Sequence, residues 1–165
     1  AIRDDNPVVF IEHRWLYWAE EDVPEEPYTI PIGEGNVVRA GDDITVVGTS
    51  WMNVEALKAS DILEKQGVSV EVVDPRTLAP FDDTVIVESV KKTGRLVTVE
   101  EGFPQSSVGT EIATRVMQQA FDYLDAPIMT IAGKDVPMPY AANLEKLALP
   151  NVGEVIDAVK AVCYK

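Results

Sequence analysis

The feature that most constrains the fold is an alternation of short β-branched runs with amphipathic helical segments. Four runs have the composition of buried strands, at residues 44–50, 68–74, 96–99 and 128–131. The segments between them repeat apolar residues at helical spacing. Strands that alternate with helices form parallel sheets through right-handed crossovers. We therefore predict an α/β fold, a three-layer α/β/α sandwich around a mostly parallel sheet of four to five strands.

Capping residues predict where the helices begin. Ser50 is placed to cap a helix over residues 51–66, and Asp82 to cap a helix that ends at Gly94. Asn151 opens the last helix in a variant of the capping box. The clearest helix follows residue 107, and its apolar stripe is expected to face the core. That stripe consists of Val108, Ile112, Ala113, Val116, Met117, Ala120, Phe121 and Leu124.

The charge of the chain is strongly negative and unevenly distributed. The 28 acidic and 14 basic residues give a formal net charge of −14, and residues 1–43 hold 11 of the acids but three of the bases. Such a field repels nucleic-acid phosphates and anionic membrane surfaces, so both are excluded as partners. Prolines interrupt the acidic run after residue 20. We predict an arm with an acidic linker over residues 1–35 and a compact domain over 36–165.

Reactive side chains are scarce. His13 and Cys163 are the single histidine and cysteine, which excludes an internal disulfide and a multi-cysteine metal site. A hydrolase triad could be built once, by bringing His13 to Ser50 or Cys163. We favour a structural or interface role for His13, at the end of a predicted apolar strand over 8–11, and a packed thiol for Cys163. No catalytic, cofactor-binding or metal-binding residue is assigned.

Two turns from strand to helix could hold an anion. Gly48 lies at the first of them, but the sequence there lacks the glycine spacing of a dinucleotide site and the Gly-Lys-Ser/Thr of a P-loop. The second runs from Gly102 to Gly109, after the carboxylates of Glu100 and Glu101. These carboxylates oppose an anion and are expected to be solvated or to cap a helix. An independent small-molecule or anion-binding α/β domain remains the alternative function.

Two longer motifs resemble a known family. They are Asp74-Pro-Arg-Thr-Leu-Ala-Pro-Phe-Asp82 and Asp135-Val-Pro-Met-Pro-Tyr140, and weaker segments lie at residues 6–17, 28–33 together with 40–47, 92–102 and 109–112. In this order they resemble the C-terminal half of the β subunit of thiamine-diphosphate-dependent 2-oxo acid dehydrogenases, the E1 component of pyruvate or branched-chain complexes. The implied fold is that of the transketolase C-terminal domain. Ser106-Ser107 departs from the pattern, because relatives usually have a Gly-Gly pair there.

The resemblance implies that most of the catalytic apparatus lies outside this chain. Complete β subunits of the family look about twice as long, and their N-terminal half is the pyrimidine-binding domain with the active-site glutamate and histidine. Residues 6–17 resemble the last strand of that domain, and His13 does not match the catalytic motif. The α subunit holds the diphosphate and Mg²⁺. We therefore expect no cofactor in this chain, although the whole enzyme uses thiamine diphosphate and Mg²⁺ to decarboxylate a 2-oxo acid and acylate lipoyl groups.

The resemblance implies an assembly domain that is inactive alone. Its partners would be the E1 α subunit, a second β subunit and, in some complexes, the peripheral-subunit-binding domain of the acyltransferase core. Large side chains outside the helix stripes are the types enriched at interface centres. Alternatively, two of them, Trp15 and Trp18, cover the core of their own domain. We expect a cytoplasmic location, or the mitochondrial matrix in a eukaryote. The candidate interface residues are Trp15, Tyr17, Trp18, Phe103, Tyr164 and Lys165.

Overall fold

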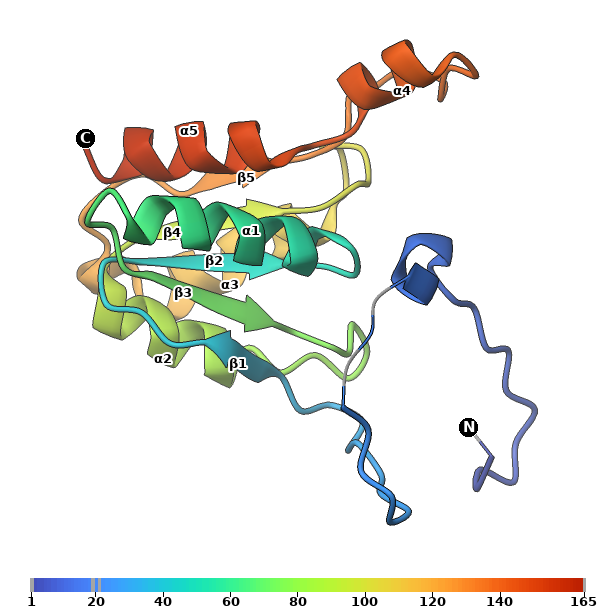
Figure 1. Ribbon diagram of the computed structural model, residues 1–165. Helices are drawn as coiled ribbons and strands as arrows, with labels where there is room; N and C mark the ends of the chain where they lie inside the picture. The colour runs from blue at the N-terminus through green and yellow to red at the C-terminus, as the bar shows by residue number, and fades with distance from the viewer. Residues whose placement is uncertain (1, 19, 21, 165) are drawn as a thin grey trace.

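The computed structural model describes residues 2–18, 20 and 22–164 (Figure 1). The described residues form five strands, five α-helices and two short 3₁₀ helices, which are labelled η. In chain order the elements are η1 (Arg14–Trp18), β1 (Asn36–Arg39), β2 (Ile44–Gly48), α1 (Met52–Glu64), β3 (Val70–Asp74), α2 (Thr84–Thr93), β4 (Leu96–Val99), α3 (Val108–Gln119), η2 (Phe121–Tyr123), β5 (Met129–Ile131), α4 (Ala142–Ala148) and α5 (Val152–Val162).

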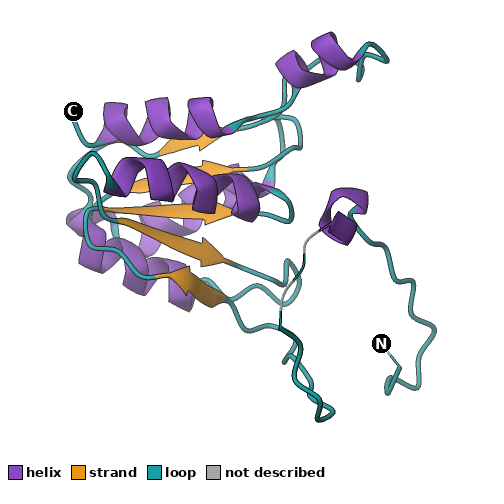
Figure 2. Cartoon of the chain, viewed as in Figure 1, coloured by secondary structure: helices purple, strands orange, loops and turns teal. Residues whose placement is uncertain are grey.

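The five strands form one sheet in the order β1-β3-β2-β4-β5. Strands β2 to β5 are parallel, and β1 is antiparallel to its neighbour β3. Helices α1 and α5 pack on one face, and α2 and α3 cover the other, as Figure 2 shows. The predicted three-layer sandwich with a mostly parallel sheet is therefore confirmed. No helix in the described part of the chain is long and apolar enough to cross a membrane.

The core consists of two apolar clusters, one on each face of the sheet. Every residue of β2 and β4 is buried, because these strands are covered by helices on both sides. Leu63 of α1 and Val159 of α5 pack in the first cluster. Ile86 of α2 packs in the second. Burial on both faces explains why the strands appear in the sequence as continuous β-branched runs rather than as alternating patterns.

Two predicted details of the helices are wrong. Ser50 does not cap α1: its backbone has a φ of +54°, and the residue before the helix is Trp51, which makes no side-chain cap. A capping hydroxyl requires an extended backbone, which Ser50 lacks. The apolar stripe predicted for α3 is also wrong at its C-terminal end. Because α3 ends at Gln119 and the chain turns into η2, Met117 is half-exposed and Phe121 is 61 % exposed.

Other capping predictions are closer to the structure. The Asp82 carboxylate accepts a hydrogen bond from the Thr84 amide at 3.2 Å, although the residue in the cap position is Asp83. Gly94 ends α2 in the left-handed conformation, with a φ of +69°. The Asn151 side chain accepts from the Glu154 amide at 3.2 Å and caps α5.

Three segments differ from the expected secondary structure. Residues 8–11 form no strand, because they have no neighbouring strand with which to pair. Strand β1 was not predicted, since its central residues Val37 and Val38 are partly exposed at the sheet edge and its pairing is irregular after Val37. Helix α4 was not predicted either, and in Figure 1 it projects beyond the sheet.

Candidate functional site

The carboxyl ends of β2 and β4 are the first place to look for a ligand site. These strands are neighbours in the sheet. After β2 the chain forms β3, which pairs with one edge of β2, and then β4, which pairs with the other edge of β2. Open α/β sheets bind ligands at such a reversal of strand order. Gly48 ends β2 here, and Glu100 directly follows β4. Both turns that the sequence singled out therefore lie at this crevice.

The turn at Gly48 is filled by the first residues of α1. A Cβ atom on Gly48 would lie 2.7 Å from the Asn53 Oδ1 and 2.8 Å from the Asn53 backbone nitrogen. The glycine is thus required for close packing of the turn against the helix.

The N-terminus of α3 is occupied by the chain's own carboxylate. The Glu100 Oε1 accepts a hydrogen bond from the Gly109 amide at 2.7 Å, and Oε2 accepts from the Val108 amide at 3.3 Å. The Ser107 hydroxyl accepts from the Thr110 amide at 3.2 Å. Glu100 is buried, so the pair of carboxylates after β4 includes a helix cap, as expected. A helix N-terminus attracts anions, but this one is already neutralised.

This arrangement does not fit the diphosphate or the metal of thiamine diphosphate. A diphosphate at the N-terminus of α3 would face the Glu100 carboxylate, which already accepts from the Gly109 amide. Within residues 2–18, 20 and 22–164, no three His, Cys, Asp or Glu side chains come together to hold a metal ion.

The arm contacts the domain at the same edge of the sheet. The His13 Nε2 lies 3.1 Å from the Glu101 Oε2, and the imidazole stacks on Trp51 with ring centres 6.1 Å apart. Trp15 meets Trp51 edge-on at 5.4 Å. His13 therefore has a structural contact that ties the arm to the start of α1.

The candidate interface residues lie on separate surfaces. Trp15, Tyr17 and Trp18 gather on η1 in the arm, beside the carboxyl ends of the strands. Tyr164 follows α5 at the opposite end of the sheet (Figure 1), and Lys165 lies outside the described residues. Trp18 is 86 % exposed, so it does not cover the core, whereas half-exposed Trp15 covers part of Trp51.

The fifth described candidate, Phe103, belongs to neither of these groups. It lies in the loop between β4 and α3 and is half-exposed. The five described candidates therefore do not form one continuous patch, because Tyr164 lies at the opposite end of the sheet from η1.

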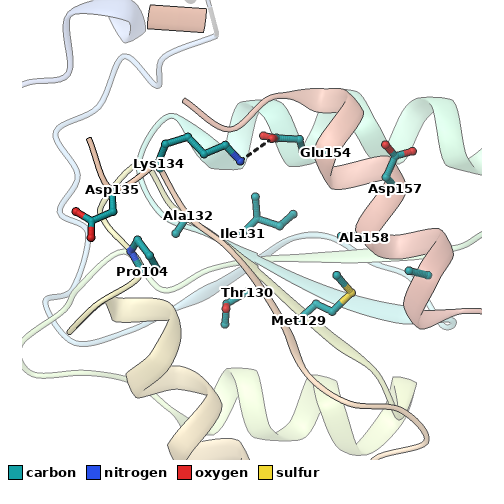
Figure 3. Close-up of a pocket in the computed structure, with 12 residues that line it drawn as sticks. Pro104, Met129, Thr130, Ile131, Ala132, Lys134, Asp135, Glu154, Asp157 and Ala158 are labelled. Carbon is teal, nitrogen blue, oxygen red and sulfur yellow. Dashed lines mark hydrogen bonds and ion pairs between the residues drawn. The ribbon is translucent and has the colours of Figure 1, made fainter. Parts of the chain in front are cut away.

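A second hollow, of about 600 Å³, runs along the edge of the sheet between β5 and α5 (Figure 3). Strand β5 pairs with β4 alone, so its other edge faces the hollow. Asp135, Glu154 and Asp157 contribute carboxylates, and the Lys134 ammonium lies 3.3 Å from the Glu154 Oε1. Asp135 and Asp157 make no ion pair within the described part of the chain. We call this hollow the β5–α5 groove. Asp135 lies about 20 residues before the other two acids, so the sequence alone does not indicate that they line one groove.

Two other carboxyl groups have pKa values below their ordinary range. Burial raises the pKa of the Glu71 carboxyl, but hydrogen bonds, led by that from Lys92, outweigh burial and lower it. A hydrogen bond from Gln119, with a further contribution from Arg115, lowers the pKa of Asp83. Neither group lines the β5–α5 groove or the crevice at Gly48, so both shifts are attributed to hydrogen bonds and ion pairs that stabilise the fold.

Comparison with known proteins gives one family. The model described as "Transketolase, C-terminal domain" matches residues 33–155. The chain is 66 % identical over 166 residues to the pyruvate dehydrogenase E1 component subunit beta of Rhizobium meliloti (strain 1021), covering 100 % of this chain and 36 % of that protein. It is 53 % identical to the protein of the same name from Rickettsia felis, covering 99 % of this chain and 50 % of that protein.

A plant protein and a solved structure agree with this result. The mitochondrial pyruvate dehydrogenase E1 component subunit beta-1 of Arabidopsis thaliana is 49 % identical, covering 100 % of this chain and 47 % of that protein. The structure titled "Split gene transketolase, inactive beta4 tetramer" superposes with a TM-score of 0.72 at 28 % identity, over 88 % of this chain and 46 % of that chain. The chain thus spans between about a third and a half of the length of these relatives.

Proposed function

Because the chain belongs to the family of transketolase C-terminal domains, we propose that it is the C-terminal part of a pyruvate dehydrogenase E1 β subunit. Its role there is to assemble subunits, without activity of its own. The relatives with this name support the identity of the whole protein. The observation that carries the assembly role is the N-terminus of α3 at this crevice, where the buried Glu100 carboxylate occupies the place that a phosphate would take.

The proposed division of the chain follows from the same comparison. Residues 1–35 are an arm, with a remnant of the last strand of the pyrimidine-binding domain and an acidic linker, and residues 36–165 are the assembly domain. The match to the family model begins at residue 33, which supports this boundary. Residues 6–17 take no strand conformation here, so the remnant would need the rest of that domain to complete its sheet.

The exposed aromatic side chains of η1 are the proposed contact with the E1 α subunit and a second β subunit. Trp15, Tyr17 and Trp18 are large, partly or fully exposed and close together, which is typical of interface centres. A related solved chain is titled as a tetramer of β chains, which supports association between copies. Phe103, Tyr164 and Lys165 belong to the same proposal on other faces.

The β5–α5 groove is the proposed contact for a basic partner. Its carboxylates at Asp135 and Asp157 are not compensated within the described residues, and the whole chain carries a net charge of −14. Opposite charge speeds association and fixes orientation. The peripheral-subunit-binding domain of the acyltransferase core is the partner that we assign to this surface.

The cofactors and the location belong to the whole enzyme in this proposal. Thiamine diphosphate and Mg²⁺ bind outside this chain, at sites formed by the missing half of the β subunit and by the α subunit. In a bacterium the complex would be cytoplasmic, and in a eukaryote it would lie in the mitochondrial matrix. The plant relatives, which are named as mitochondrial, support the second location.

An activity measurement tests the central claim. The purified 165-residue chain is given pyruvate, thiamine diphosphate and Mg²⁺, and release of carbon dioxide is measured with and without the E1 α subunit. We expect no turnover from the chain alone. Decarboxylation that requires no other polypeptide would overturn the assembly role.

A binding measurement tests the two surfaces separately. In the full-length β subunit, Trp18→Ala is expected to weaken assembly with the α subunit by about tenfold, as expected for an aromatic interface anchor. Asp157→Lys is expected to weaken binding of the peripheral-subunit-binding domain and to leave α assembly unchanged. The reverse pattern, or no effect of either substitution, contradicts the assignment of surfaces.

A further inference from the structure

A cavity of about 600 Å³ lies where the arm meets the carboxyl ends of the strands. It is separate from the β5–α5 groove and lies beside the crevice between β2 and β4, on the side of Trp51 and Glu101. Four parts of the chain form it: η1, the start of α1, the residue pair after β4, and α4 with the loop that follows it. The side chains that matter for its chemistry are Trp15, Trp51, Glu55, Glu101, Glu145 and Leu149.

The walls of the cavity are aromatic. Trp15 and Trp51 stand nearly perpendicular, at 80°, with ring centres 5.4 Å apart. The Lys58 ammonium lies 5.0 Å from the Trp51 ring centre and 2.8 Å from the Glu55 Oε1. An ammonium between an indole face and a carboxylate is a favourable cation–π arrangement. The position of Lys58 thus shows that the wall formed by Trp51 and Glu55 attracts positive charge.

The polar groups of the cavity are mostly negative. Three glutamates line it, against the single lysine Lys146. Glu101 contacts His13 through Oε2, which leaves Oε1 without a hydrogen bond among the described residues. The Glu145 carboxylate, on α4, makes no hydrogen bond or ion pair within the same part of the chain. A positively charged group can therefore bind at Glu101 and Glu145 without displacing an existing ion pair.

We propose that this cavity is a binding site for a small organic cation. The apolar body of the ligand lies against Trp15, Trp51 and Leu149, and its amine faces Glu101 and Glu145. The volume suits a small ligand, and mostly apolar walls with a few polar groups are typical of such sites. A reversal of strand order is also where α/β sheets bind ligands. The cavity shares Trp15 with the proposed subunit interface, but amine binding is measured on the 165-residue chain without other subunits, so each proposal can fail alone.

Three probes of similar shape and different charge test the site on the 165-residue chain. They are 2-phenylethylamine, 2-phenylethanol and 3-phenylpropionate, titrated by calorimetry at low salt. We expect the amine to bind at least about fivefold tighter than the alcohol, and the anion to give no measurable binding. Equal affinity for amine and alcohol would overturn the proposal.

The three tryptophans provide an internal check of where the amine binds. In NMR spectra the indole N–H signals of Trp15 and Trp51 are expected to shift on titration with the amine. The signal of Trp18, which does not line the cavity, is expected to stay in place. A shift of Trp18 without the other two places the amine elsewhere and contradicts the proposal.

Substitutions separate the aromatic and the charged contributions. Trp15→Ala is expected to weaken amine binding about tenfold, and Glu145→Gln about threefold. Glu145 lies on α4, away from the link between His13 and Glu101, so its change leaves the arm in place. Asp157→Asn, in the β5–α5 groove, is the matched control and is expected to have no effect. Amine binding that survives both Trp15→Ala and Glu145→Gln unchanged contradicts the proposed site.

Discussion

The arm and the domain use apolar residues in opposite ways. In the domain, the β-branched residues of β2 and β4 are fully buried between two layers of helices. In the arm, residues 8–11 are equally apolar, yet none of the described residues from 2 to 35 is buried. The difference is the presence of neighbours: β2 pairs on both sides, and the arm has no strand beside it. Apolar composition alone therefore does not predict burial, and an exposed apolar segment indicates a surface for other chains.

The largest expected effect is a loss of core packing in the domain. Leu63→Ala is expected to lower the free energy of unfolding by about 3–4 kcal/mol, because Leu63 is completely buried and its truncation leaves a cavity. The measurement is urea denaturation followed by circular dichroism. Ile62→Ala, at the adjacent position of α1 but 40 % exposed, is the matched control and is expected to cost less than about 1 kcal/mol. Equal losses for both would contradict the packing described for α1.

The next effect comes from a buried ion pair. Lys92→Met leaves the carboxylate of Glu71, which is 3 % exposed, without its cation, and is expected to cost about 2–3 kcal/mol. Lys92 itself is partly exposed, so the cost falls below that of a fully buried pair. Lys91→Met, which breaks the surface pair with Glu88, is the control and is expected to cost less than about 0.5 kcal/mol.

The same variant has a defined pH dependence. The pKa of Glu71 is lowered in the folded state from its ordinary value of 4.5, so the ion pair contributes stability above that value. This contribution is lost as the pH falls through the folded-state pKa. The difference in stability between the wild-type chain and Lys92→Met should therefore shrink below about pH 4.5. A difference that is constant from pH 7 to pH 3 would show that the pair is not the cause.

A smaller effect is expected at the N-terminus of α3. Glu100→Gln keeps one acceptor for the Gly109 amide but removes the charge, and should cost about 1.5 kcal/mol. Hydrogen exchange at the first turn of α3 should become faster. Glu88→Gln, on the surface of α2, is the control. Unchanged exchange at Val108 and Gly109 would mean that the carboxylate does not hold these amides.

The smallest effect is expected in the arm. Trp18→Ala should change the free energy of unfolding by less than about 0.5 kcal/mol, because the side chain is almost fully exposed. Thermal and urea unfolding of the 165-residue chain measure this directly. A loss above about 1 kcal/mol would show that Trp18 packs on the domain and would remove the contrast between the two regions.

The central sheet could be predicted because its signal is local. Each buried parallel strand is a continuous β-branched run, and its neighbours along the chain are amphipathic helices, so the strand β4 was predicted at its observed bounds. The edge strand β1 has weak signals because Val37 and Val38 are partly exposed. The conformation of Ser50 depends on how the turn packs, and the end of α3 depends on where the chain leaves the helix. Neither the conformation of Ser50 nor the end of α3 can be predicted from the spacing of apolar residues.

The surfaces could be predicted less well, because they combine residues that are distant in the sequence. The aromatic residues of η1 stand together in the chain, so they were found as candidates. Asp135 and Asp157 line the β5–α5 groove from opposite sides (Figure 3), and the cavity between the arm and the domain brings Trp15 to Trp51, with Glu145 in the same lining. Only the folded chain shows these pairs. For Glu100 the sequence predicts either a solvated carboxylate or a helix cap, because the residue follows a strand and precedes a helix. The structure shows the cap.

The Glu100 cap also has a consequence for the domain inside a cell. A helix N-terminus that holds its own counter-ion is shielded from nucleotides and sugar phosphates, because each of them would have to displace a carboxylate that belongs to the chain itself. The start of α3 is therefore expected to be insensitive to the concentrations of such compounds.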